Sequence, residues 1–354
     1  MQDEKLLEAL ETGSTAALAR TISVVENARP GFEQLLAGLH RKLGRARRVG
    51  ITGPPGAGKS TLTQQLVGQW RLQQKRVAVV AVDPTSPFSG GALLGDRIRM
   101  EAVALDEGVY IRSMATRGSL GGLATSTREV CDVLDAAGFE RILIETVGVG
   151  QSELAVTTMA DTTALVLVPE SGDGIQALKS GVMEAADVYV VNKADRPGAG
   201  NLAREIESTI AIRQGKAYRG MRGHHGVSGV GGRASGVASR ESTPDTRNPT
   251  PDSWVPPVLL TTATTGAGVP ELIEALERHL GWMESHGVLE ERRRARFAAR
   301  TREVVDRAMH RYVWNETRSE SLLRERLDEV VTGQLSPYEL AEEIMTGLKD
   351  GARV

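Results

Sequence analysis

The chain has 354 residues, of which 40% are hydrophobic and 25% are charged, a balance typical of soluble globular proteins. Its formal net charge of −2 gives no reason to expect nucleic acid or a membrane surface as a partner. The single cysteine, Cys131, excludes an intrachain disulfide and fits a reducing compartment. The sequence shows no leader segment and no apolar run of about 18 residues, so we expect a cytoplasmic protein.

Residues 1–45 are rich in Leu, Ala, Glu and Arg and predict an N-terminal helical extension. Short β-branched runs then alternate with helical patterns. We expect strands at 49–52, 77–82, 109–113, 142–146, 164–168, 188–191 and 258–261. We expect helices at 59–74, 96–106, 122–137, 151–160, 175–186, 199–213 and 270–279. This alternation predicts an α/β fold, a mostly parallel sheet with helices on both faces.

The main domain is expected to span residues 46–281, with one insertion. Residues 215–251 hold almost no large apolar side chain, so they cannot bury enough surface to offset their ordering entropy. From residue 282 the chain is predicted to be helical to its end. A charged helix in 282–354 carries an apolar stripe from Phe297 to Trp314, which indicates either a homodimerisation region or a solvated helix face.

One stretch fits the phosphate-binding pattern G-x-x-x-x-G-K-[ST] at every fixed position. It lies between a predicted strand and a predicted helix, where backbone N–H groups and the helix dipole can surround phosphate oxygens. Lys59 would reach the β- and γ-phosphates, and the Ser60 hydroxyl would ligate Mg²⁺. The predicted nucleotide-binding residues of this loop are Gly53, Pro54, Pro55, Gly56, Ala57, Gly58, Lys59, Ser60 and Thr61.

A second stretch, 192–195, reads N-K-A-D and follows the predicted strand 188–191. Ligands of such sheets bind at the carboxyl ends of strands. The Asp195 carboxylate can accept two hydrogen bonds from guanine, whereas adenine would place a ring acceptor against it, so GTP is favoured over ATP. Asn192 would tie this loop to the phosphate loop, and the Lys193 stem would lie along the base. The base pocket would be completed through backbone N–H groups by Thr262, Ala263 and Thr264.

Glu145 ends a further predicted strand and can hold Mg²⁺ directly or through water. The Gly148 N–H can meet the γ-phosphate, and the link that follows suits a switch that senses this phosphate. Gln151 in that link either orients water or starts a helix.

Two aspartates are further candidates for the part of the site that faces the phosphates and Mg²⁺. Asp83 directly follows the second predicted strand, in a loop stiffened by prolines. Asp96 is either the N-cap of a helix or a Mg²⁺ contact. Arg97 or Arg99 would neutralise charge during phosphoryl transfer, and the sequence does not choose between them.

Together these motifs resemble a known family. The similar stretches read G-P-P-G-A-G-K-S, V-D-P-T-S-P, L-G-D-R-I-R-M, E-T-V-G-V-G-Q-S-E and N-K-A-D. They resemble the GTPase chaperones of adenosylcobalamin-dependent methylmalonyl-CoA mutase, which belong to the SIMIBI class. The resemblance is strong over residues 40–213 and looser over 256–345. It implies a GTPase that binds GTP, GDP and Mg²⁺, gates cobalamin loading and protects a cobalamin-dependent acyl-CoA mutase.

The resemblance also implies roles for single residues. Lys59, Asp83 and Glu145 would serve catalysis, and the Mg²⁺ side would comprise Ser60, Asp83, Asp96 and Glu145. The stretch from residue 172 matches a switch loop through which the family signals its mutase. Its coupling residues would be Gln176, Lys179 and Glu184. From the residues alone, 175–186 reads as a packed amphipathic helix.

Three alternatives stand beside this interpretation. A nickel-delivery GTPase of the same class would need Cys or His ligands, and one cysteine and six histidines argue against it. A phosphotransferase would need an acceptor pocket with a base, for which no motif is found. A nucleotide-gated binding module that holds GTP without useful turnover would share almost all of the same residues.

Overall fold

The structure is a computed structural model and describes residues 2–83, 101–115, 120–146, 152–169, 181–213 and 253–349. The chain divides into two compact units, Met1–Leu289 and Glu290–Val354. The insertion predicted at 215–251 lies outside the described residues.

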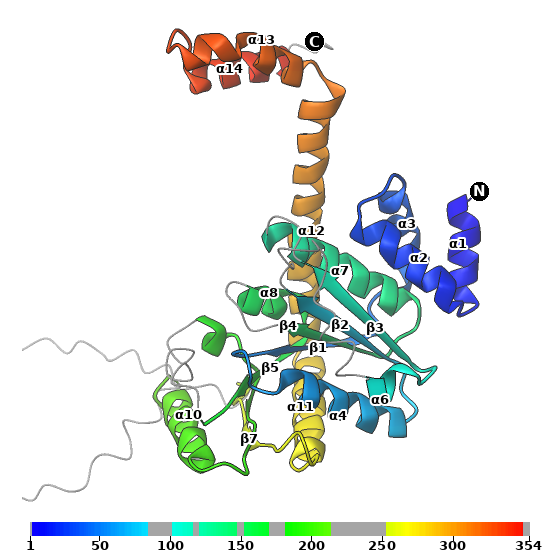
Figure 1. The fold of residues 1–354 in the computed structure, drawn as a ribbon, viewed down its shortest axis with the longest axis vertical. Coiled ribbons are helices and arrows are strands. Elements are labelled where there is room, and N and C mark those ends of the chain that lie inside the picture. The colour runs from blue at the N-terminus through cyan, green and yellow to red at the C-terminus, as the bar shows by residue number, and fades with distance from the viewer. Residues whose placement is uncertain are drawn as a thin grey trace, which may run out of the picture. The chain divides into compact units, whose positions relative to one another are not determined.

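A sheet of seven parallel strands forms the centre of the first unit, in the order β3-β2-β4-β1-β5-β6-β7 (Figure 1). The chain runs from β1 to one side of the sheet and, after β4, crosses to the other. The carboxyl end of β1 is therefore a switch point, where open parallel sheets bind ligands. The strands are β1 (Arg47–Thr52), β2 (Val77–Asp83), β3 (Val109–Ala115), β4 (Arg141–Thr146), β5 (Thr162–Leu167), β6 (Val188–Val191) and β7 (Val258–Leu260).

Helices cover both faces of this sheet, with α7 on one side and α4 on the other (Figure 1). Leu62 of α4 and Leu276 of α11 share a buried core with Ile51 of β1. Leu134 of α7 and Val156 of α8 belong to the core on the opposite face. The helices are α4 (Lys59–Leu72), α6 (Glu101–Ala104), α7 (Leu120–Ala136), α8 (Ser152–Met159), the 3₁₀ turn η2 (Gly181–Glu184), α10 (Ala199–Arg213) and α11 (Val269–Ser285). The predicted α/β class is confirmed.

The N-terminal segment is helical, as its composition predicts. Ser14 caps α2 by accepting a hydrogen bond from the Ala17 N–H at 3.2 Å. Ile22 of α2 and Leu35 of α3 share one buried core with Cys131 of α7. This segment consists of α1 (Gln2–Glu11), α2 (Thr15–Glu26), α3 (Phe32–Leu39) and the 3₁₀ turn η1 (His40–Lys42).

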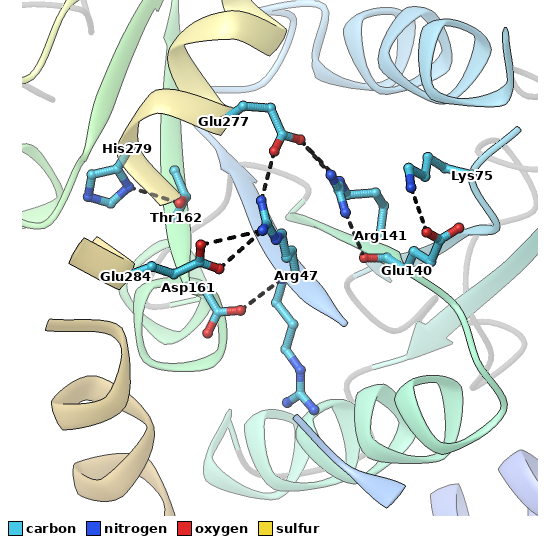
Figure 2. A network of polar contacts seen from close by, with 10 residues as sticks. Arg47, Lys75, Glu140, Arg141, Asp161, Thr162, Glu277, His279 and Glu284 are labelled. Atoms are coloured by element: carbon cyan, nitrogen blue, oxygen red, sulfur yellow. Dashed lines mark hydrogen bonds and ion pairs between the residues drawn. The ribbon is translucent and has the colours of Figure 1, made fainter. Parts of the chain in front are cut away.

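Ion pairs link the amino ends of the strands to α11, as Figure 2 shows. Glu277 of α11 accepts hydrogen bonds from Arg47 at 2.9 Å and from Arg141 at 2.8 Å. These two arginines begin β1 and β4. Arg47 also pairs with Glu284 at 3.1 Å. The carboxyl half of α11 is thereby fixed to the starts of two central strands.

Other polar contacts at this edge are buried. The Asp135 carboxylate at the end of α7 accepts three backbone N–H bonds, at 2.7 to 3.1 Å, from Gly44, Arg45 and Ala46. Arg48 pairs with Asp132 at 2.7 Å, and both side chains are almost fully buried. These contacts join α7 to the segment that enters β1.

A partly exposed ion pair completes the amino edge. Lys75, just before β2, donates to the Glu140 carboxylate at 2.7 Å (Figure 2). This hydrogen bond, aided by the Arg76 backbone N–H, holds the pKa of the Glu140 carboxyl below its ordinary value of 4.5.

The C-terminal unit contains little buried surface. Leu340 and Ile344 are its buried apolar residues among those described, and Arg326 joins α13 to Glu343 of α14 at 3.2 Å. Its elements are α12 (Val288–Arg311), which begins two residues before the unit, the π-helical turn η4 (Tyr312–Glu316), α13 (Ser319–Val331) and α14 (Pro337–Lys349). In the described part of the chain, no helix is long and apolar enough to cross a membrane.

The described ends of the predicted helices agree with the observed ones to within two residues, except in two cases. The helix predicted at 270–279 continues to Ser285, because Leu280 and Met283 extend its apolar spacing into the core. Residue 282 therefore lies inside α11. Of the helix predicted at 175–186, the described part is a 3₁₀ turn, Gly181–Glu184, and residues 175–180 lie outside the described residues.

Candidate functional site

The predicted phosphate loop connects β1 to α4 at the carboxyl edge of the sheet. Gly53 has φ +138°, and a Cβ there would come within 2.0 Å of the Val166 carbonyl oxygen. Gly58 has φ +84°, and a Cβ there would come within 2.5 Å of the Asn192 amide nitrogen. Only glycine satisfies both the backbone conformation and the space at these two positions. The loop therefore lies close against β5 and against the residue that follows β6.

The Lys59 side chain lies buried inside this loop. Its ammonium donates hydrogen bonds to the carbonyl oxygens of Gly53 at 2.8 Å and Pro54 at 2.9 Å. Lys59 begins α4, so its backbone N–H and that of Ser60 lie at the positive end of the helix dipole. A positive charge and a helix N-terminus thus lie at one place, an arrangement that favours the binding of an anion such as phosphate.

Ser60 and Glu145 lie side by side, although 85 residues separate them in the sequence. The Ser60 hydroxyl donates to the Glu145 carboxylate at 2.6 Å, and both side chains are buried. Glu145 is the penultimate residue of β4, whose neighbour in the sheet is β1. A hydroxyl and a carboxylate in contact form an oxygen-rich pair of the kind that Mg²⁺ prefers.

Asn192 joins the phosphate loop to the base-side loops. Its amide nitrogen donates to the Ala57 carbonyl at 2.8 Å. Its amide oxygen accepts hydrogen bonds from the Ala263 N–H at 3.0 Å and the Thr261 hydroxyl at 3.1 Å. The tie between Asn192 and the phosphate loop is the contact that the sequence predicted.

Two residues predicted to contact the base, Lys193 and Asp195, follow Asn192 and are not buried. Lys193 has φ +57°, an uncommon conformation for a residue with a side chain, and Asp195 two residues later is exposed. The Ala194 N–H donates to the Thr261 carbonyl at 2.9 Å, which fixes the loop to the end of β7. In the following loop Ala263 is buried and Thr264 is exposed. Both base-side loops are therefore ordered around one edge of the sheet.

Several predicted residues lie outside this description. Asp96, Gly148, Gln176 and Lys179 are not among the described residues. Asp83 is the last residue of β2, and only its backbone position is described. Glu184 is exposed on η2 and lies 3.9 Å from Arg213 at the end of α10. The structure thus brings together Lys59, Ser60, Glu145, Asn192 and the 262–264 loop.

Thr261 is a site residue that the sequence did not single out. Its side chain is buried, and its hydroxyl fixes the orientation of the Asn192 amide. Its backbone N–H also donates to the Val191 carbonyl at 2.9 Å. The sequence offers one local signal, because Thr261 directly precedes the predicted base-pocket stretch Thr262–Ala263–Thr264.

Among the described residues, no group of three or more His, Cys, Asp or Glu side chains is placed to hold a metal ion. The Ser60 hydroxyl and the Glu145 carboxylate offer two oxygen ligands, which suits a cation that takes few ligands from the protein. Mg²⁺ is such a cation, since it retains several waters and takes its remaining oxygen ligands from substrate phosphates.

A parallel sheet with this phosphate loop after its first strand, tied to an N-K-x-D loop, defines a P-loop GTP-binding protein. The chain belongs to one family of that class, because residues 18–318 match the methylmalonyl-CoA mutase-associated GTPase family MeaB. The predicted family and the prediction of a GTPase are both confirmed.

Individual relatives agree with this assignment. A protein of Pyrococcus horikoshii named as a GTPase is 39% identical over 342 residues, which cover 97% of each chain. A mouse protein named methylmalonic aciduria type A homolog, mitochondrial, is 32% identical over 365 residues, covering 98% of this chain and 79% of its own length. The crystal structure of an LAO/AO transport system kinase shares the fold, with a TM-score of 0.63 and 24% identity over 98% of this chain and 97% of its own.

Proposed function

We propose that the protein is a Mg²⁺-dependent GTPase chaperone that gates adenosylcobalamin loading into a cobalamin-dependent acyl-CoA mutase and protects that enzyme. Methylmalonyl-CoA mutase is the expected partner. The observation that carries this partner is the match to a mutase-associated GTPase family over residues 18–318. We place the protein in the cytoplasm, in keeping with its single cysteine.

The nucleotide chemistry follows from the site residues. We assign phosphate binding to Lys59 and to residues 53–61, and guanine binding to Asn192, Lys193, Asp195 and residues 262–264. Lys59 is held by neutral carbonyl oxygens at present distances of 2.8 and 2.9 Å. Phosphate oxygens carry negative charge and form stronger hydrogen bonds with an ammonium, so the lysine can exchange these carbonyls for the β- and γ-phosphates.

Ser60 and Glu145 are the residues assigned to Mg²⁺, with Asp83 and Asp96 as further candidates. Both oxygens of the first pair are buried and lie 2.6 Å apart. When bound, the ion neutralises charge on the transferring phosphate. Glu145 accepts a hydrogen bond from the Ser60 hydroxyl, so this hydrogen bond would have to open for both oxygens to ligate a cation. Lys59 would stabilise the same phosphate while water attacks it.

The C-terminal unit supports the homodimer. Phe297, Val305 and Met309 of α12 have exposed fractions of 40%, 52% and 53% and are spaced along one face of the helix. An apolar stripe of this kind is covered when two copies associate. Sedimentation velocity of the wild type and of Val305→Glu tests this, with a dimer and a monomer as the expected species. A monomeric wild type contradicts the homodimer and leaves the GTPase assignment intact.

Coupling to the mutase is assigned to Gln176, Lys179 and Glu184. Glu184 supports this assignment because its side chain is 75% exposed and lies at the end of that stretch. The carboxylate is thus accessible to a partner, and its contact with Arg213 is long enough to be exchanged.

The test is GTP hydrolysis by the purified protein, with ATP as a control, alone and with the cobalamin-dependent mutases of the same organism. We expect a slow GTP-specific rate that one mutase raises severalfold. The Glu184→Gln variant is expected to keep the slow rate and to lose this stimulation by the mutase. A rate that no mutase alters contradicts the chaperone role. Binding of GTP without hydrolysis under any condition would instead favour a nucleotide-gated binding module.

A further inference from the structure

Two buried threonine hydroxyls interrupt an apolar row of side chains across the sheet. Met114 of β3 lies opposite Val82 of β2, and Val82 lies opposite Thr146 of β4. On the other side of β1, Thr52 lies opposite Leu165 of β5. The register that pairs Ile51 with Glu145 places Thr52 beside Thr146. The Thr146 hydroxyl donates to the Thr52 hydroxyl at 3.1 Å.

The position of this pair in the chain is specific. Thr52 directly precedes Gly53, the first residue of the phosphate loop, and Thr146 directly follows Glu145. Their exposed fractions are 0% and 1%. The two hydroxyls therefore link the start of the phosphate loop to the residue beside the proposed cation ligand.

The threonine pair lies on the opposite face of the sheet from the Ser60–Glu145 pair. A Cβ at Gly50 would meet Val156 of α8 at 2.9 Å, so Gly50 faces α8, and Thr52 two residues later shares that face. Ser60 belongs to α4, which packs on the other face. Two adjacent residues at the end of β4 are therefore held by one side-chain hydrogen bond on each face of the sheet, Thr146 by Thr52 of β1 and Glu145 by Ser60 of α4.

The two bonds differ in what cation binding would do to them. The Ser60–Glu145 bond must open if both groups turn to Mg²⁺, which is a step that rests on the function proposed above. The Thr52–Thr146 bond involves neither group. It can therefore remain closed and keep the strand ends in register while the first bond is exchanged.

We propose that Thr52 and Thr146 are positioning residues for GTP hydrolysis. Their hydrogen bond holds the start of the phosphate loop in place beside β4. It does so while the Ser60–Glu145 hydrogen bond opens and the two side chains turn to the cation. A shift of the loop by a fraction of an ångström would misplace Lys59 and Ser60 relative to the γ-phosphate, and misplacement of this size lowers a rate steeply.

The test compares Thr52→Val, Thr146→Val and the double variant with the wild type. Valine has nearly the shape of threonine, and each single variant leaves one buried hydroxyl unpaired, which lowers stability. The double variant leaves neither hydroxyl and is expected to regain the wild-type melting temperature. We expect all three to show roughly tenfold lower kcat and a severalfold higher Mg²⁺ concentration for half-maximal rate. GDP affinity in EDTA stays unchanged, and Thr146→Ser keeps wild-type kinetics.

The matched control is Thr21→Val, which removes a buried threonine hydroxyl from α2, outside the sheet. It is expected to keep the wild-type kcat and Mg²⁺ requirement. A double variant with wild-type kcat and Mg²⁺ requirement would overturn the positioning role, as would a loss of GDP affinity in EDTA equal to the loss of kcat. A wild type whose hydrolysis needs no Mg²⁺ would contradict the proposed cation role itself, before any variant is considered.

Discussion

Polar side chains at the two ends of the same seven strands are held in different ways. At the amino ends charge meets charge, since Arg47 and Arg141 share Glu277 (Figure 2). At the carboxyl ends Lys59 is held by neutral carbonyl oxygens, and Asp195 is exposed. An ion pair that is already complete has little to gain from a ligand. An ammonium held by carbonyls gains a stronger partner when phosphate arrives.

The comparison indicates that contacts at the amino edge of the sheet serve stability, whereas groups at the carboxyl edge serve activity. The amino-edge pairs join elements that are far apart in the sequence, such as β1 and α11. Loss of one partner there leaves a charge without its counter-ion and lowers the stability of the fold. Loss of a charged carboxyl-edge group such as Lys59 or Asp195 is expected to lower nucleotide binding or turnover and to change stability little. Four substitutions test this division.

The largest expected effect is that of Lys59→Ala on GTP hydrolysis. We expect kcat to fall by about 10³-fold, because a charged donor to the transferring phosphate is lost in a buried site. Lys75→Ala is the matched control, since it also removes a lysine ammonium, but one that is paired with Glu140 at the amino edge. It is expected to retain the wild-type kcat. Full hydrolysis by Lys59→Ala would refute the assigned mechanism.

Asp135→Ala is expected to produce the reverse pattern. The carboxylate accepts three backbone N–H bonds, so its removal leaves the buried Ala46 N–H and two partly buried N–H groups without this acceptor and lowers the free energy of unfolding by about 3 kcal/mol. Urea denaturation measures this loss. GTP affinity measured well below the midpoint should stay within a factor of about two. A comparable loss of affinity would mean that the two edges are coupled.

Asp195→Asn tests the assignment of guanine. The amide replaces one acceptor oxygen with a donor nitrogen, so it can no longer accept two hydrogen bonds from the base. We expect GTP affinity to fall by roughly 10²-fold and affinity for xanthosine triphosphate to rise, since xanthine presents an acceptor where guanine has an amine. Glu205→Gln, an exposed change on α10, is the control. Unchanged GTP affinity in Asp195→Asn would contradict the base assignment.

The smallest expected effect concerns pH. The pKa of Glu140 is lowered by Lys75, so its ion pair contributes stability above the ordinary carboxyl value of 4.5, and this contribution is lost as the pH falls through the lowered value. Both side chains are partly exposed, which limits the contribution to about 0.5 kcal/mol. The free energy of unfolding of Glu140→Gln should therefore be lower than that of the wild type at pH 7, and the two values should converge in acid. If the difference persists at low pH, it does not come from this ion pair.

The sequence predicted the strands well because most are short apolar runs rich in β-branched residues. Strand 188–191 agrees at both ends, and the strand predicted at 142–146 begins one residue earlier, at Arg141. The phosphate loop and the contact between Asn192 and this loop were predictable, because each sequence motif is associated with one local backbone conformation. Asn192 lies at the end of a strand that places it against Ala57.

The contacts that sequence reasoning missed are those without a local pattern. Arg47 and Glu277 are separated by 230 residues, and nothing in either neighbourhood indicates the other. Thr52, Thr146 and Thr261 look like ordinary strand residues, because the tertiary pairing of the hydroxyls depends on sheet order and register. The length of α11 was underestimated because its last turns pack on Leu289 of the following helix.

The burial of Cys131 gives the protein a built-in reporter. Its thiol is the only one in the chain and is fully covered in the α7 core, so a thiol reagent reaches it only when that core opens. The rate of labelling therefore measures the population of the open form, without any added probe. A nucleotide that binds only the closed form should slow labelling in proportion to one plus its concentration divided by its Kd. One unmodified chain could then rank GTP, GDP and ATP by the protection that each confers on a single sulfur atom.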